Sequence, residues 1–174
     1  FEGPNGELLS GPSSSPENSY LVDVDGKKVS VFLAISPTMD IQIIGDLPIY
    51  VAMDSADVWA EPMFFQLDET NVPPEWSGLP PDYFSEDGQL WGNPLYRWDA
   101  MEADGFGWWI RRIDGAAKLY DVIRIDHFRG LESYWAVPYG ETTAKNGHWV
   151  KGPGMKLVSA LQSWFPGLAF IAED

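Results

Sequence analysis

Cysteine is absent from this chain of 174 residues, and histidine occurs only twice, as His127 and His148. The lack of cysteine excludes disulfide bonds, thiol nucleophiles and cysteine-ligated zinc. Two histidines are too few for a histidine-rich metal centre. We therefore expect neither a metal site nor a cofactor.

Positive charge is also scarce. Eleven Lys and Arg residues stand against 26 Asp and Glu residues, which gives a formal net charge of −15. Binding to nucleic acid requires basic runs that neutralise phosphates, so nucleic acid is not an expected partner. No apolar run is long enough to span a membrane, so no membrane partner is expected. No secretion signal is visible, although the chain starts at Phe1 without Met, and we expect a cytoplasmic protein. The sequence leaves the oligomeric state open.

Aromatic residues and proline are abundant, with nine Trp and fourteen Pro. An apolar content of 45% is too high for a disordered chain. The flat faces of indole rings are surfaces on which the C–H faces of sugars stack. Trp91, in a segment rich in Gly and Pro, fits this role. Trp108 and Trp109 lie in a predicted helix and are better explained by core packing.

The order of predicted elements indicates an α/β fold. Apolar, β-branched runs predict strands over residues 41–44, 122–126 and 168–173. Helices are predicted over 99–119 and 154–165, and long loops over 71–94 and 130–153. Alternating strands and helices are typical of parallel sheets, and in a (β/α)8 barrel catalysis takes place at the C-terminal ends of the strands.

Two predicted strands carry a carboxylate at that end. Asp126 lies two residues after Arg124, so both side chains share one face of the strand. The guanidinium is expected to lower the pKa of Asp126, and apolar surroundings to raise that of Glu173. Such a pair suits a nucleophile and a general acid in a retaining glycosidase. The alternative is a structural Arg–Asp pair at a strand end. His127 is read either as a sugar ligand or as a satisfied polar residue.

Several motifs stand in one order along the chain. They are Gly45-Asp46-Leu47-Pro48-Ile49-Tyr50-Val51-Ala52, Asp54-Ser55-Ala56-Asp57-Val58-Trp59, Pro80-Pro81-Asp82-Tyr83-Phe84-Ser85, Gly88-Gln89-Leu90-Trp91-Gly92-Asn93-Pro94-Leu95-Tyr96, Arg124-Ile125-Asp126-His127-Phe128-Arg129-Gly130 and Ile171-Ala172-Glu173-Asp174. Together they resemble the 4-α-glucanotransferases (amylomaltases, disproportionating enzymes) of glycoside hydrolase family 77. The resemblance covers about residues 41–174.

This resemblance implies a partial (β/α)8 barrel and retaining transfer of α-1,4-glucan segments through a glucosyl-aspartate. It implies that Asp126 is the nucleophile and Glu173 the acid/base. The further residues that it assigns to α-1,4-glucan or maltooligosaccharide binding are Arg124, His127, Tyr50, Asp82, Trp91 and Asn93. Residues 80–91 look like a loop that covers the bound glucan. The family's third carboxylate is expected on a later strand, beyond Asp174.

The N-terminal part shows a different resemblance. Residues 11–20 and 37–44 are similar to a piece of an α-L-fucosidase of glycoside hydrolase family 95. The resemblance implies that Glu17 corresponds to a catalytic acid of that family; the alternative is that Glu17 is an ordinary loop residue. In that family residues 41–44 begin a helix rather than form a strand. We therefore expect a fucosidase-like loop and β segment over 1–40 and a glucanotransferase-like catalytic domain over 41–174. The alternative functions are an α-L-fucosidase and a catalytically inert joined fragment.

Overall fold

The computed structural model describes residues 19–24, 27–32 and 41–173. The chain divides into two compact units, residues 1–41 and 42–174. In the first unit, β1 (Ser19–Val24) pairs antiparallel with β2 (Lys27–Phe32), within the range where the sequence predicts a β segment. Glu17, the candidate fucosidase residue, lies outside the described residues.

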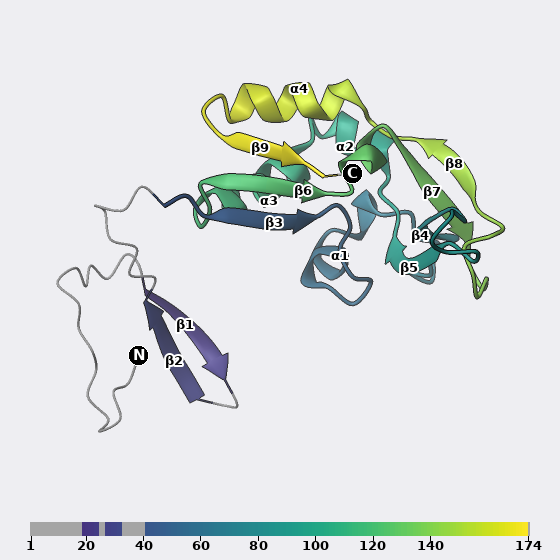
Figure 1. Cartoon of the computed structure of the whole chain (residues 1–174), viewed down its shortest axis with the longest axis horizontal. Coiled ribbons are helices and arrows are strands. Elements are labelled where there is room, and N and C mark those ends of the chain that lie inside the picture. The colour runs from purple at the N-terminus through teal and green to yellow at the C-terminus, as the bar shows by residue number, and fades with distance from the viewer. Residues whose placement is uncertain (1–18, 25–26, 33–40, 174) are drawn as a thin grey trace. The chain divides into compact units, whose positions relative to one another are not determined.

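The second unit is built on a parallel sheet of three strands (Figure 1). β3 (Ile44–Pro48), β6 (Val122–Asp126) and β9 (Ala169–Ala172) lie in the order β3-β6-β9. The predicted strand at 122–126 is confirmed, and the one at 168–173 is confirmed to within one residue at each end. The α/β class of the second unit is thereby confirmed.

The strand predicted at 41–44 is wrong in its bounds, because β3 begins at Ile44 and continues through Gly45 to Pro48. Gly45 does not end the strand. A Cβ atom there would lie 2.0 Å from the ring of Tyr120, so glycine permits the close approach of that ring. Residues 41–43 form neither strand nor helix. The Ile43 N–H donates to the Asp121 carboxylate (2.8 Å), which ties the start of β3 to the start of β6.

Four α-helices accompany the second unit: α1 (Ala56–Ala60), α2 (Trp98–Ala103), α3 (Gly107–Ala117) and α4 (Met155–Trp164). α4 confirms the helix predicted at 154–165. The single helix predicted at 99–119 is wrong, because it is interrupted where Gly105 and Phe106 adopt positive φ angles of 65° and 60°. None of the described helices is long and apolar enough to cross a membrane.

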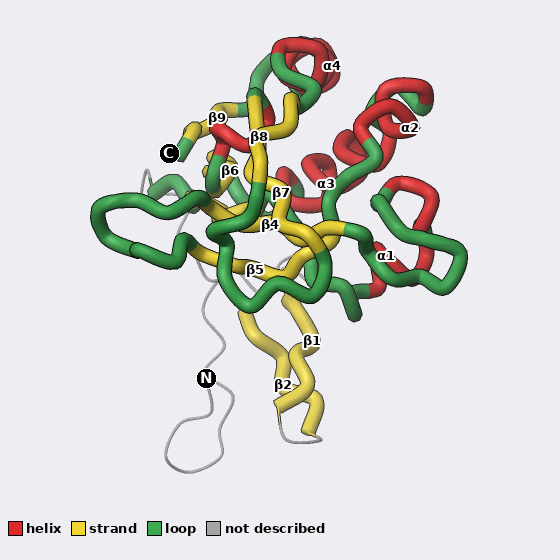
Figure 2. Tube along the Cα trace, turned by 90° about the vertical axis from the view of Figure 1, so that its right-hand side faces the viewer, coloured by secondary structure: helices red, strands yellow, loops and turns green. Residues whose placement is uncertain are grey.

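The two predicted long loops are also wrong, because both contain strands of a second sheet (Figure 2). β4 (Glu75–Leu79), β5 (Gln89–Pro94), β7 (Ser133–Pro138) and β8 (His148–Lys151) form an antiparallel sheet in the order β5-β4-β7-β8. Gly, Pro and charged residues conceal the strand pattern in β4 and β5. β5 pairs with β4, and β4 pairs with β7, a partner from a distant part of the chain.

The second sheet lies beyond the C-terminal ends of the parallel strands (Figure 1). A core of aromatic and aliphatic side chains joins the two sheets to the helices. Trp109, Tyr96 and Phe65 are its largest fully buried members. Trp108 and Trp109 are therefore core residues, as predicted. The result is a rigid framework around the ends of β3, β6 and β9.

Candidate active site

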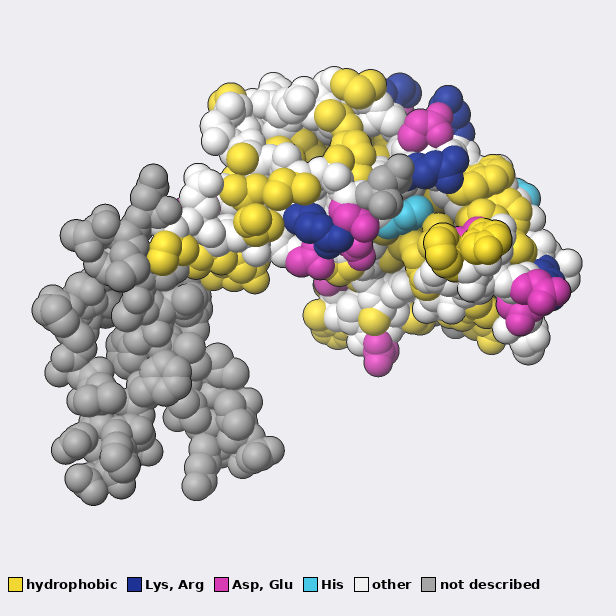
Figure 3. All heavy atoms as spheres, viewed as in Figure 1, with side chains coloured by type: hydrophobic (Ala, Val, Ile, Leu, Met, Phe, Trp, Pro, Cys, Tyr) yellow, Lys and Arg dark blue, Asp and Glu magenta, His cyan; other side chains and the backbone are white. Residues whose placement is uncertain are grey.

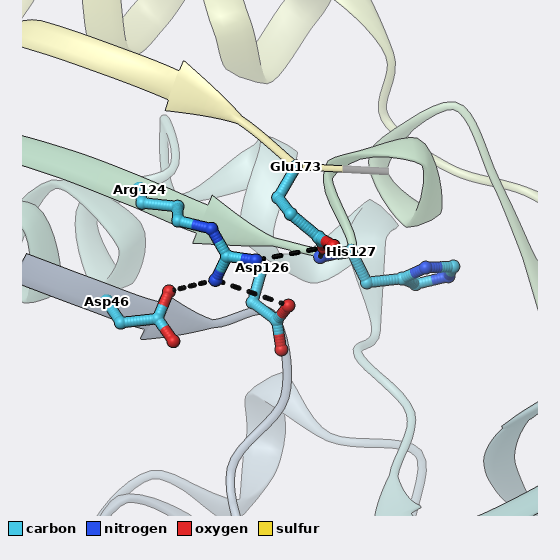
Figure 4. A network of polar contacts seen from close by, with 5 residues as sticks. All are labelled: Asp46, Arg124, Asp126, His127 and Glu173. Carbon is cyan, nitrogen blue, oxygen red and sulfur yellow. Dashed lines mark hydrogen bonds and ion pairs between the residues drawn. The ribbon is translucent and has the colours of Figure 1, made fainter.

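Charged side chains from all three parallel strands meet at their C-terminal ends (Figure 4). Asp46 on β3 lies beside Arg124 on β6, and Arg124 lies beside Ile171 on β9, two residues before Glu173. Asp126 ends β6, next to Pro48 at the end of β3. The parallel register thus brings together side chains that are far apart in the sequence.

Arg124 is the centre of this group. Its Nη1 lies 2.5 Å from Asp46 Oδ1 and 3.7 Å from Asp126 Oδ1, and its Nη2 lies 3.3 Å from Glu173 Oε1. One cation therefore contacts three carboxylates, and these carboxylates raise the pKa of Arg124 further. The arrangement holds two carboxylates near each other that would otherwise repel.

The main chain fixes Glu173 just after β9. Its N–H donates to the Ile125 carbonyl (3.1 Å), and its carbonyl accepts from the Phe128 N–H (2.7 Å). The side-chain Oε2 accepts from the backbone N–H of His127 at 3.1 Å. His127 has a left-handed backbone conformation, φ 53°, and its ring points away from Arg124 (Figure 4).

The two carboxyl groups have pKa shifts opposite to those expected from the sequence. Partial burial raises the pKa of Asp126, and the neighbouring Glu173 raises it further against the effect of Arg124. The hydrogen bond from His127 N–H is the main cause that lowers the pKa of Glu173. Glu173 is also nearer than Asp126 to the guanidinium. Spacing along β6 shows that Arg124 and Asp126 share a face. It does not show that Asp46 and Glu173 also contact the guanidinium of Arg124.

A pocket of about 660 Å³ opens beside these carboxylates, a size typical of small-molecule sites. Five predicted site residues line it: Tyr50, Trp91, Asn93, Asp126 and His127. On this face, acidic, basic and histidine side chains gather next to a hydrophobic area (Figure 3). The pocket therefore has a carboxylate, Asp126, at one part of its lining and an aromatic wall, which includes Tyr50 and Trp91, at another.

The aromatic wall is held by packing and hydrogen bonds. The Trp91 ring meets His127 edge to face at 5.0 Å and lies 6.3 Å from Tyr50. Asn93 donates from Nδ2 to the Val51 carbonyl (3.1 Å) and accepts from Ser77 Oγ (3.4 Å). Burial raises the pKa of Tyr50 far above its ordinary value, so its hydroxyl is neutral. These side chains form a polar and aromatic surface of defined shape.

Asp82 is separate from this pocket in the structure. It is exposed, and its carboxylate accepts hydrogen bonds from the N–H groups of Phe84 (2.8 Å) and Ser85 (2.7 Å). In the same segment the rings of Tyr83 and Phe84 are 97% and 94% exposed. Substrate contact by Asp82 stays a prediction, and the contacts that the structure gives it stabilise a turn.

Two features of the site are not indicated by the sequence patterns. Asp46 stands near the end of β3, and its place beside Arg124 would follow from the register once 44–48 is recognised as a strand. Arg112 on α3 donates to backbone carbonyls at the pocket wall, and no sequence pattern indicates this. Among the described residues, no group of three or more His, Cys, Asp or Glu side chains could hold a metal ion.

The chemistry available is that of paired carboxylates beside a sugar-sized pocket. One carboxylate can attack a carbon centre, and the other can donate and accept a proton. Because the two groups are coupled, their titration belongs to the pair.

Comparison with known proteins gives a consistent result. The family model for 4-alpha-glucanotransferases of glycoside hydrolase family 77 matches residues 32–174. The 4-alpha-glucanotransferase of Aquifex aeolicus is 57% identical over 134 residues, which are 77% of this chain and 28% of that enzyme. The chloroplastic/amyloplastic enzyme of Solanum tuberosum is 54% identical over 134 residues, which are 77% of this chain and 23% of that enzyme.

A solved structure is similar over the same region. The amylomaltase from Streptococcus agalactiae in complex with acarbose is 47% identical, with a TM-score of 0.74, over 77% of this chain and 27% of that one. The chain thus spans about a quarter of the length of the relatives it matches. Because the family model covers most of its residues, the chain belongs to the 4-alpha-glucanotransferase family, glycoside hydrolase family 77.

Proposed function

We propose that this protein transfers α-1,4-glucan segments between maltodextrins with retention of configuration. The observation that carries the proposal is the meeting of Arg124, Asp126 and Glu173 beside an aromatic pocket. Acarbose in the complex of the Streptococcus agalactiae relative supports an oligosaccharide as the ligand. Tyr50, Trp91, Asn93 and His127 line the pocket in which we place the sugar rings.

The reaction has two displacement steps. In the first, an Asp126 oxygen attacks the anomeric carbon, and the bond to the leaving glucan oxygen breaks as Glu173 gives that oxygen its proton. In the second, Glu173 takes the proton from the 4-hydroxyl of an acceptor glucan, whose oxygen displaces Asp126. Arg124, close to both carboxylates, favours the ionised form of Asp126 that attacks, against the effects of burial and of Glu173.

The assignment of the two roles rests on family membership rather than on the pKa shifts. A lowered pKa of Glu173 and a raised pKa of Asp126 describe the site without sugar. A bound glucan displaces water from around the paired carboxylates, which disfavours two negative charges side by side. We propose that this raises the pKa of Glu173 toward the working range of a general acid.

We further propose that β3, β6 and β9 are consecutive strands of a (β/α)8 barrel. Their parallel order supports it, as does the place of the site at their C-terminal ends. In this barrel a third carboxylate, from a strand after Glu173, completes the site. A cytoplasmic location stays a prediction, and the potato relative is named as chloroplastic/amyloplastic.

The decisive experiment is incubation with maltotriose of a protein that contains these residues and has the full length of the relatives, which we call the intact protein. A glucanotransferase releases glucose and forms longer maltodextrins, which chromatography separates. Glu173→Gln is the matched control, because it keeps the side-chain size and removes the proton donor. A protein that gives neither product contradicts the proposal.

The fucosidase-like interpretation of residues 1–40, including Glu17, stays a prediction, since the family match begins at residue 32. Release of fucose from 2'-fucosyllactose would support it. A protein that acts on neither sugar would support the third alternative, an inert joined fragment.

A further inference from the structure

We propose that Arg112 is a positioning residue. Its hydrogen bonds to backbone carbonyls fix the segment Pro48–Ile49–Tyr50, which forms one wall of the sugar pocket. This inference rests on the proposed function for its substrate. Pro48 is the last residue of β3, and Ile49 and Tyr50 follow it. All three line the pocket. No ladder hydrogen bonds continue past Pro48 on this side of the sheet in the described chain.

Arg112 supplies donors to the carbonyls at this point. Its Nη2 donates to the Pro48 carbonyl at 2.6 Å, and its Nη1 donates to the Ile49 carbonyl at 3.1 Å. Hydrogen bonds from a charged donor are stronger than neutral ones, and a guanidinium can make two with fixed mutual geometry. Arg112 therefore fixes the direction of two consecutive peptide groups.

A second donor reinforces the Ile49 carbonyl. The hydroxyl of Tyr96 donates to it at 2.6 Å, and the Tyr96 side chain is fully buried. The Tyr96 ring stacks on Tyr50, with centroids 5.6 Å apart and planes 26° apart. One buried residue thus holds both the backbone before Tyr50 and the ring of Tyr50.

The guanidinium itself is held by its own helix. It lies 5.4 Å from the ring centre of Trp108 and 5.2 Å from that of Trp109, within the range of cation–π attraction. Both indoles belong to the core. Arg112 therefore connects rigid core packing in α3 to the pocket wall. Because Pro48 pairs with Asp126, the held peptide also borders the nucleophile.

Arg111 offers a matched control. It is the preceding residue of α3, and its side chain is 57% exposed and pairs with Glu61 at 2.6 Å, away from the pocket-lining residues. Arg111→Met removes the same charge from the same helix without touching Pro48 or Ile49. Tyr96→Phe removes one donor to Ile49 and keeps the aromatic ring.

The first measurement is amide hydrogen exchange over residues 46–53 of the intact protein. We expect exchange there to become about tenfold faster in Arg112→Met, and about threefold faster in Tyr96→Phe, because hydrogen bonds hold this segment closed. Arg112→Lys should be intermediate, since one ammonium cannot hold both carbonyls as a guanidinium fork does. Arg111→Met should leave the segment unchanged. Unchanged exchange in Arg112→Met, or equal acceleration throughout the chain, overturns the proposal.

The second measurement is transfer from maltotriose. We expect Arg112→Met to raise KM about tenfold and to change kcat by less than about threefold, because the wall binds sugar while other residues do the chemistry. A fall in kcat at unchanged KM contradicts the positioning role. If the unaltered protein transfers no glucan, the proposed function fails, while the exchange experiment still decides whether Arg112 holds the wall.

Discussion

At the scale of single residues, one guanidinium organises the candidate site. Arg124 contacts Asp46, Asp126 and Glu173, and each carboxylate comes from a different strand or its end. The shared face of Arg124 and Asp126 is predictable from a period of two along a strand. The opposite pKa shifts of Asp126 and Glu173 are not predictable, because they depend on burial and on a backbone N–H that only the folded chain brings close.

Asp126→Asn tests the proposed nucleophile. An amide is a poor nucleophile and a poor leaving group, so the rate of glucan transfer should fall on the order of 10⁴-fold or more. Glucose release from maltotriose by the intact protein measures this. Normal activity in the variant would exclude the assignment of Asp126.

The two carboxylates should affect stability in opposite directions. The raised pKa of Asp126 means that its ionised form is disfavoured in the folded state, so its contribution falls as the pH rises above about 3.9. The lowered pKa of Glu173 means that its contribution is present above about pH 4.3 and is lost as the pH falls through the lower folded value.

Thermal unfolding of the protein at pH 7 and about pH 3 measures these contributions. The change in Tm relative to the unaltered protein should be more positive at pH 7 than at about pH 3 for Asp126→Asn. For Glu173→Gln it should be more negative at pH 7 than at about pH 3. Comparing the same variant at two pH values cancels the change in packing that the substitution causes, because that change does not depend on pH. Shifts of the same sign in both variants would show that the pKa directions are misassigned.

At the scale of elements, parallel strands are more easily predicted than the rest. Residues 122–126 and 168–173 are apolar, β-branched runs, and their strands lie close to the predicted positions. The predicted bounds of β3 are displaced because glycine is disfavoured inside strands, whereas Gly45 lies within β3 and Tyr120 packs against it. β4 and β5 escape prediction because their local propensity is weak; β4 is a strand through its pairing with β5 and the distant β7, and β5 through its pairing with β4.

The break between α2 and α3 gives a test with two glycines. Gly105 has φ 65°, and nothing lies within 4 Å of the position that an added methyl group would take. Gly105→Ala should therefore destabilise the protein by about 1 kcal/mol through backbone strain alone. Gly115 lies inside α3 with similar free space and no positive φ. Gly115→Ala should therefore stabilise by about 0.5–1 kcal/mol.

Urea denaturation of both variants measures these free energies. The opposite signs separate conformational strain from the effect of adding a methyl group. Equal effects of the two substitutions would mean that residues 104–106 do not interrupt the helix in solution.

At the scale of the whole molecule, the outer strands of the described parallel sheet, β3 and β9, each pair with β6 alone, so each has one unpaired edge. Unpaired strand edges favour association with other chains. Loss of a single electrostatic stabiliser costs a catalyst about 10²–10³ in rate, and the proposed third carboxylate is such a group.

The 174-residue chain, expressed by itself, should therefore release no glucose from maltotriose above the level of its Glu173→Gln variant. A mass of 19.5 kDa confirms the species that is assayed. Light scattering checks for association in the same sample. Strong turnover by this species would mean that three strands and two carboxylates suffice, or that another copy completes the site.

The order of the two sheets along the chain also has a consequence for folding kinetics. β3 pairs with β6 across 78 residues, from Ile44 to Val122, and β4 pairs with β7 from the segments between the parallel strands. Neither sheet can form from neighbouring residues alone, and closing large loops before any contact forms slows folding. Substitutions that weaken the β4–β7 pairing are therefore expected to act on how fast the protein reaches its native state as well as on how firmly it stays there.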